Sequence, residues 1–178
     1  MKKVLLLALS LIIMGCGTME FADFSRNMKT AEKVDLGKYL GTWYEYARLE
    51  VSFEKGMTKT TANYTLLEPD RQGRTRVQVL NSGIKPGGKF TQARGKAVLP
   101  DPAEPGRLKV SFFGPFYADY NMIALDEVNY QWVLVAGSST KYLWFLSRTP
   151  QMDPNVFARL KSIAEGYGYD TSALIYPQ

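Results

Sequence analysis

The chain has 178 residues, of which 46% are apolar and 22% are charged. This composition is that of a globular domain able to bury a hydrophobic core, and it excludes a chain that is disordered throughout. There is one Cys and no His. An internal disulfide is therefore excluded, as are histidine-dependent triads, HExxH zinc sites and CxxC redox pairs, so no cofactor or metal site is expected.

The first residues have the pattern of a secretory leader. A basic start, Met1–Lys3, precedes an apolar run, Val4–Met14, that is shorter than the ~20 residues of a transmembrane helix. The following Gly15-Cys16 resembles the lipobox of bacterial lipoproteins, in which the cysteine is acylated after cleavage. We expect a signal peptide over residues 1–15 and a lipid anchor at Cys16. The alternative is a free or buried cysteine beside an uncleaved segment.

The mature chain is expected to begin at Cys16 and to continue as a flexible tether over residues 16–33. The residue after the cysteine is Gly17 and not Asp. By the lipoprotein sorting rule this implies the outer membrane, with the domain facing the periplasm. Cleavage removes two lysines, so the net charge falls from +5 to +3. The basic residues are interspersed with acidic ones, which argues against a nucleic-acid partner.

Beyond the tether, short segments of strand-forming residues alternate with turns rich in Pro, Gly and Asp, which predicts an antiparallel up-and-down sheet. Eight strands are expected, at Thr42–Leu49, Thr58–Glu68, Arg74–Ser82, Phe90–Leu99, Arg107–Phe113, Ala118–Asp126, Tyr130–Ala136 and Lys141–Arg148.

The alternation of side chains predicts which face of each strand is buried. In Leu108–Phe112 apolar and polar residues alternate with period two, so one face is wet. In Met122–Leu125, Trp132–Val135 and Leu143–Leu146 both faces are apolar, so another element must cover the outer side of the last three strands.

A helix after the eighth strand is the predicted cover. Asp153 is an N-cap residue and Pro154 suits the first helical position, while Gly166 and Gly168 end the helix. One apolar stripe at helical spacing comprises Val156, Leu160, Ile163, Ala164 and Tyr167. The predicted fold is all-β, an eight-stranded antiparallel barrel over residues 34–178 with one C-terminal α-helix packed on its outside. The interior of such a barrel is either filled by side chains or holds one small ligand.

Three segments carry a family resemblance. Gly41–Arg48, Val110–Phe116 with Tyr120–Asp126, and Tyr142–Pro150 resemble the conserved motifs of lipocalins, in the form found in bacterial lipoprotein lipocalins and apolipoprotein D. The resemblance covers the chain from Val34 to its end. It implies a ligand-binding barrel without the disulfides of secreted lipocalins.

The resemblance also implies the roles of two residues. In lipocalins the Trp of the first motif closes one end of the barrel and the Arg after the last strand lies across its ring, a cation–π contact. Here these residues are Trp43 and Arg148. Their role is expected to be structural, because the contact joins the first strand to the last.

The resemblance to apolipoprotein D points to four ligand-binding residues, Tyr64, Asn81, Phe112 and Trp144. Tyr120 is added because it shares the inward face of its strand. For each ring, plain core packing is the alternative. Asn81 is more informative, because an amide on an apolar face needs a partner from a ligand, a tyrosine hydroxyl or water.

The leading functional hypothesis is a membrane-anchored binding protein whose partner is a small hydrophobic ligand, a fatty acid or lysophospholipid, held for storage or transport in the cell envelope. One alternative is an envelope scaffold with a filled barrel. Another is an enzyme in which the inward-facing Glu45 acts as a buried acid, but no His, nucleophile motif or metal cluster accompanies it, so no enzymatic activity is expected. A monomer and a homodimer both remain open.

Overall fold

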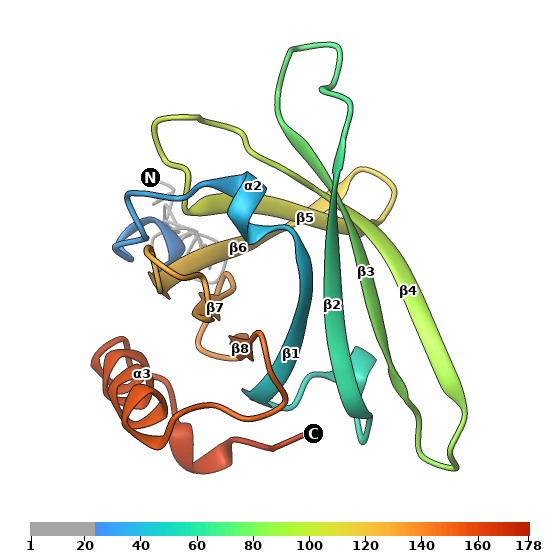
Figure 1. Ribbon diagram of the computed structural model, residues 1–178, viewed down its shortest axis with the longest axis vertical. Coiled ribbons are helices and arrows are strands. Elements are labelled where there is room, and N and C mark those ends of the chain that lie inside the picture. Colours follow the sequence, from blue (N-terminus) through green and yellow to red (C-terminus); the bar gives the residue numbers. More distant parts are fainter. Residues whose placement is uncertain (1–23) are drawn as a thin grey trace, which may run out of the picture.

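The computed structural model describes residues 24–178, so the expected signal peptide and Cys16 lie outside the described residues. Eight antiparallel strands form a closed barrel in chain order, with β1 paired to both β2 and β8 (Figure 1). The predicted fold class is confirmed. The strands are β1 Gly41–Arg48, β2 Thr58–Leu67, β3 Arg76–Ile84, β4 Phe90–Val98, β5 Arg107–Phe113, β6 Phe116–Leu125, β7 Trp132–Ala136 and β8 Leu143–Ser147.

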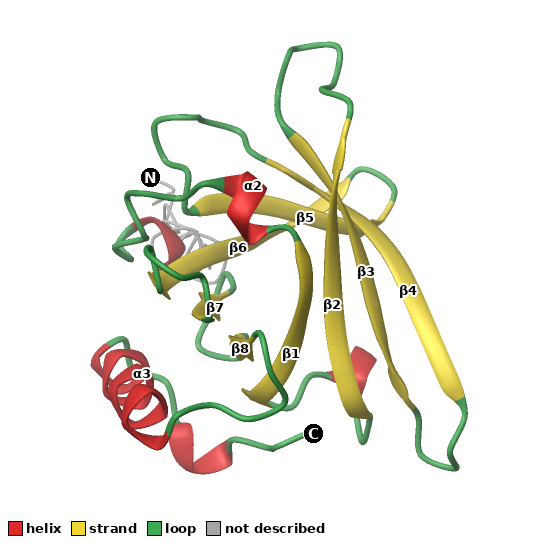
Figure 2. Cartoon of the chain, in the orientation of Figure 1, coloured by secondary structure: helices red, strands yellow, loops and turns green. Residues whose placement is uncertain are grey.

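Among residues 27–178, three short helical elements were not predicted: α2 (Leu36–Tyr39), η1 (Ser52–Glu54) and η2 (Thr171–Ala173). Each is too short to produce a helical period in the sequence. Figure 2 shows α2 beside the start of β1. Its N-cap residue Asp35 accepts hydrogen bonds from the backbone N–H groups of Gly37 and Lys38.

The C-terminal helix α3 (Pro154–Gly166) lies outside the barrel, as the sequence predicts (Figure 1). The Asp153 carboxylate accepts from the N–H groups of Asn155 and Val156 at 2.9 and 3.1 Å. Leu160 and Ala164 are fully buried against the outer faces of the last strands. The apolar outer faces of β6 to β8 are therefore covered by this helix and by the chain that flanks it.

A separate core lies inside the barrel. It includes Trp43, Val79, Met122 and Val135, all less than 5% exposed, and α2 packs against it through Leu36 and Tyr39. Both cores are built from residues between Phe24 and Leu174. In the part of the chain that the structure describes, no helix is long and apolar enough to cross a bilayer.

The end of the barrel near α2 is closed by the expected contact between two side chains. The Arg148 guanidinium carbon lies 3.9 Å from the centroid of the Trp43 ring. The same guanidinium donates to the backbone carbonyls of Lys38, Tyr39, Thr42 and Tyr130 at 2.7–3.1 Å. The Trp43 indole N–H donates to the Tyr39 carbonyl at 2.8 Å.

Residues 24–31, which we expected in the flexible tether, instead lie against the barrel. Met28 is 2% exposed in the outer core, and the Ala31 N–H donates to the Met122 carbonyl at 2.8 Å. The Arg107 guanidinium donates to the carbonyls of Ser25 and Met28 at 2.8 and 2.5 Å. The sequence of this segment is polar and aperiodic. Because the contacts are made mostly through backbone carbonyls, they do not produce a residue pattern that predicts the packing.

We predict that Arg148→Ala lowers the free energy of unfolding by about 3 kcal/mol, because it removes a desolvated cation–π contact and the donor to four carbonyls. Urea denaturation followed by tryptophan fluorescence measures the change. The control is Arg71→Ala, since Arg71 is exposed in the β2–β3 connection. A loss no larger than that of the control contradicts the closing role of Arg148.

Candidate functional site

The interior near the Trp43 end is filled by three tyrosines. The Tyr120 hydroxyl lies 2.5 Å from the Tyr39 hydroxyl and 2.9 Å from the Tyr64 hydroxyl. The Tyr39 ring packs on Trp43 and Tyr64 with centroid separations of 4.9 and 5.3 Å. Burial raises the pKa of all three phenols, so they are neutral at physiological pH and form a polar layer inside the closed end of the barrel.

The five residues predicted to bind the ligand all lie on inward faces, but on five different strands. Tyr64 on β2 is buried in the inner core, and Phe112, Tyr120 and Trp144 pack against that core while partly exposed. Of these, the structure joins Tyr64 and Tyr120 directly by a hydrogen bond. Asn81, Phe112 and Trp144 lie on β3, β5 and β8, so they are distributed around the interior and do not form one cluster.

Asn81 is the polar residue that the sequence singled out, and its surroundings are unusual. It lies on β3 between Ala62 of β2 and Ala93 of β4, on the same face as the buried Val77 and Val79. Its Oδ1 atom is buried and has no hydrogen-bond partner. A buried acceptor without a donor is costly, so this position favours a bound group that donates a hydrogen bond.

A buried cluster of three charged side chains lies farther along the interior. The Arg48 Nε atom is 3.3 Å from a Glu45 oxygen and 3.6 Å from a Glu54 oxygen, and all three residues are at most 5% exposed. The Arg48 Nη2 atom donates to the Glu54 carbonyl at 2.6 Å. The Trp144 indole N–H donates to the Glu54 carboxylate at 3.3 Å, which ties the β1–β2 connection to β8.

Two carboxyl groups share one guanidinium in this cluster, so one of them has no matching charge. Burial, and then the neighbouring Glu54 charge, raise the pKa of Glu45 to about 8. Burial also raises the pKa of Glu54, against the opposing effect of Arg48. Glu45 is therefore the carboxyl that keeps its proton at neutral pH, and the cluster is close to neutral.

Small residues follow one another on the inward face of β4. Ala93 on β4 is exposed although its strand neighbours on the same face, Gly95 and Ala97, point inward. A Cβ atom at Gly95 would meet the Phe112 ring at 2.8 Å. The lack of a side chain at Gly95 therefore leaves the space that the Phe112 ring occupies.

The comparisons with known proteins agree with this geometry. A family model described as "Lipocalin-like domain" matches residues 34–178. The chain belongs to the lipocalins. It is 37% identical to "Outer membrane lipoprotein Blc" of Vibrio cholerae over 179 residues, which cover 100% of this chain and 99% of the relative.

Further similar proteins support membership of the same family. The Escherichia coli K12 protein of the same description is 41% identical over 154 residues, covering 86% and 84% of the two chains. Mouse apolipoprotein D is 36% identical, covering 78% of this lipocalin and 74% of the relative. Among solved structures, insecticyanin from Manduca sexta superposes with a TM-score of 0.64 at 19% identity, covering 85% and 84%, which supports the fold alone.

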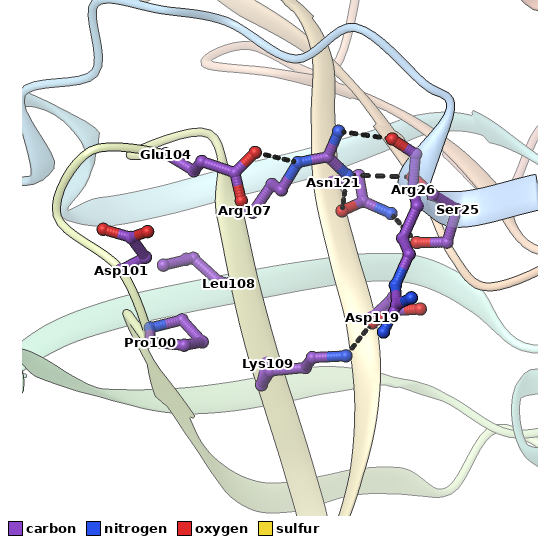
Figure 3. Close-up of a pocket in the computed structure, with 10 residues that line it drawn as sticks. All are labelled: Ser25, Arg26, Pro100, Asp101, Glu104, Arg107, Leu108, Lys109, Asp119 and Asn121. Carbon is purple, nitrogen blue, oxygen red and sulfur yellow. Dashed lines mark hydrogen bonds and ion pairs between the residues drawn. The ribbon is translucent and has the colours of Figure 1, made fainter. Parts of the chain in front are cut away.

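Two grooves of this lipocalin lie outside the barrel and are distinct from the interior site. The groove in Figure 3 has a volume of about 330 Å³ and lies beside β5 and β6, where Arg107 holds the N-terminal segment. Four of its six charged residues are paired, Arg107 with Glu104 and Lys109 with Asp119. The second, of about 590 Å³, lies between the outer face of β1 and the C-terminal Tyr176 and Gln178.

Sequence reasoning missed Arg48, Glu54 and Tyr39. Strict alternation from Glu45 places Ala47 inside and Arg48 outside, but a β-bulge between Glu45 and Ala47 reverses the order, so Ala47 joins the outer core and Arg48 points inward. No residue type in Tyr46-Ala47 marks this bulge. The pairing of Arg48 with Glu54 could not be predicted either, because an Arg at a strand end followed by an acidic residue in the next loop is a common pattern.

Within residues 24–178, no group of three or more His, Cys, Asp and Glu side chains is placed to hold a metal ion. Glu45, the candidate acid of the enzyme hypothesis, is instead engaged with Arg48. The arrangement provides apolar walls, a few hydrogen-bonding groups and a neutralised charge cluster, which is the composition of a pocket for a small amphiphile.

The raised pKa of Glu45 gives a test by pH. Between pH 5 and 8 the unfolded chain loses the Glu45 proton while the folded chain keeps it, so stability falls by up to about 1.4 kcal/mol per pH unit. Glu45→Gln abolishes this dependence, and we expect the variant to gain stability relative to the parent as the pH rises. Urea unfolding at several pH values checks this, with the exposed Glu127→Gln as control. If the difference in the free energy of unfolding between Glu45→Gln and the parent does not vary with pH, the raised pKa of Glu45 is contradicted.

Proposed function

We propose that this lipocalin is a lipid-anchored protein of the bacterial outer membrane that binds a fatty acid or lysophospholipid in the open half of its barrel and stores or transports it in the cell envelope. Gly15-Cys16 provides the anchor, and the outer-membrane descriptions of the Blc relatives support the location. The domain faces the periplasm, and its activity is binding rather than catalysis.

The observation that carries this proposal is the buried, unpaired acceptor of Asn81 among apolar inward-facing side chains. A filled structural core has no reason to retain such an atom, because an apolar residue of similar size avoids the cost. The exposed Ala93 opposite Asn81 indicates that this part of the interior is reached from outside. The rings of Phe112 and Trp144 supply apolar walls for an acyl chain.

The polar groups of the interior favour a lysophospholipid over an ionised fatty acid. The Asn81 Oδ1 atom can accept a hydrogen bond from the glycerol hydroxyl of a lysophospholipid. The charge of Arg48 is already matched by that of Glu54, because Glu45 keeps its proton at neutral pH. A second anion beside this cluster would be left without a counter-charge.

Trp144→Ala tests the position of the ligand. We expect the dissociation constant for palmitoyl lysophosphatidylcholine, measured by isothermal titration calorimetry, to rise about tenfold, equivalent to about 1.4 kcal/mol of lost contact. The matched control is Trp132→Ala, because Trp132 packs on the outer core with the Arg159 guanidinium 4.6 Å from its ring. Equal effects of the two substitutions contradict the assignment of Trp144.

The scaffold alternative is tested by the same preparation. The purified soluble domain is extracted with organic solvent and titrated with the lipid. Absence of co-purified lipid together with no heat of binding at high micromolar concentration supports a filled barrel and overturns the binding proposal.

Asn81→Leu separates recognition of the head group from recognition of the chain. Because the substitution removes an unpaired acceptor, we expect the free energy of unfolding to rise by about 1 kcal/mol. The affinity for the lysophospholipid is expected to fall while the affinity for an alkane of equal chain length is retained, both measured by calorimetry. An equal loss for the two probes shows instead that the substitution blocks the pocket.

A further inference from the structure

The two ends of the barrel carry different exposed side chains. In an up-and-down barrel the β1–β2, β3–β4, β5–β6 and β7–β8 connections lie at one end, here called the open end, and the other three lie with α2 at the closed end (Figure 1). Large apolar side chains are exposed at both ends. Those at or beside the open end are all aromatic: Phe53, Phe90, Phe113, Phe116, Tyr117 and Tyr142.

The aromatic side chains of the open end have unusually high exposure. Phe113 and Phe116, at the β5–β6 hairpin, are 81% and 79% exposed, and Phe53 and Phe90 are above 60%. Phenylalanine has no polar atom that gains from contact with water, so each ring at a hairpin tip is unfavourable in the isolated domain. A row of such residues on separate connections indicates a surface that is covered in use.

Positive charge accompanies these rings. Five exposed lysines lie at or beside the open-end connections, namely Lys55, Lys59, Lys85, Lys89 and Lys141, with Glu50 as the exposed acid beside them. The closed-end connections instead expose Glu68, Asp101, Glu104 and Glu127, together with Arg71 and an Arg74 that is paired with Asp70. The charge difference between the ends distinguishes them for a charged partner.

The combination of aromatic rings and lysines is the one that the interface of an anionic bilayer favours. Aromatic side chains partition to the level of the lipid head groups, and lysines near them extend their ammonium groups to anionic phosphates. An apolar protein partner would be served by the rings alone and would not require the lysines.

The start of the described chain is compatible with this orientation. The Phe24 ring lies 6.0 Å from the Tyr169 ring, and the Tyr169 hydroxyl donates to the Ser139 carbonyl in the β7–β8 connection. Ser25 and Arg26 also line the groove beside the β4–β5 connection of the closed end, so the chain enters the domain between the two ends of the barrel. Seven residues lie between Cys16 and Phe24, and the eight Cα–Cα steps span at most roughly 28 Å, which keeps the domain close to a membrane that holds the anchor.

We propose that the aromatic and basic rim formed by the open-end connections is a docking surface for an anionic phospholipid bilayer, so that the mouth of the barrel faces the membrane. The surface is separate from the interior pocket. An acyl chain leaving the bilayer then enters the barrel without crossing bulk water.

The test uses the soluble chain from residue 17, which contains both cores of the described fold. We measure co-sedimentation with vesicles of phosphatidylethanolamine containing one-quarter phosphatidylglycerol. The double variant Phe113→Ser/Phe116→Ser is compared with Leu66→Ser/Val128→Ser, a matched control at the closed end, where these residues are 55% and 76% exposed. We expect at least tenfold weaker binding for the first variant and no change for the second.

Two further measurements complete the test. Lys85→Glu/Lys89→Glu is expected to weaken vesicle binding, and vesicles of pure phosphatidylcholine are expected to bind the parent chain more weakly. Calorimetry with lysophosphatidylcholine below its micellar concentration is expected to give the same affinity for the rim variants as for the parent chain, which keeps this proposal distinct from the function of the pocket. Equal vesicle binding of the two double variants overturns the proposal. The proposal is also overturned if sedimentation shows that the aromatic and basic rim joins two copies of the chain while vesicles are not bound.

Discussion

Closure of the sheet is the constraint on which the other features of this lipocalin depend. Because β1 pairs with both β2 and β8, no strand of the described barrel is left with an open edge. The Arg148 guanidinium completes the closure by lying over the Trp43 ring while it donates to carbonyls before β1, within β1 and before β7. One side chain thus joins the two ends of the sheet and seals the barrel beside α2.

Closure also determines where the functional groups are placed. The closed end is filled by Trp43 and by Tyr39, Tyr64 and Tyr120, so any ligand is confined to the space toward the open end. There the bulge in β1 adds Arg48 to the inward face that already carries Glu45. A buried ion cluster is rarely a net source of stability. Here it gives the interior a polar layer and holds the β1–β2 connection, through Glu54, against Trp144.

Features of this fold that depend on neighbours in the chain could be predicted, whereas features set by tertiary contacts could not. Strand alternation and the Asp153-Pro154 helix start depend on neighbours in the chain, and both predicted the right elements. The boundaries of β3, β6, β7 and β8 shifted by up to two residues because pairing with adjacent strands, which sets strand ends, is not encoded locally. The packing of residues 24–31 on the barrel was missed for the same reason, since Arg107 binds their carbonyls and not their side chains.

The amino-acid sequence by itself determined the family, the eight strands, the covering helix and the inward direction of Tyr64, Asn81, Phe112, Tyr120 and Trp144, because these follow from periodicity and from motifs with a fixed order. Only the tertiary structure decided that the Asn81 oxygen lacks a partner, that Arg48 turns inward and that the exposed rings and lysines share one rim. These properties depend on contacts between strands far apart in the chain, and a single bulge is enough to reverse the side on which a residue lies.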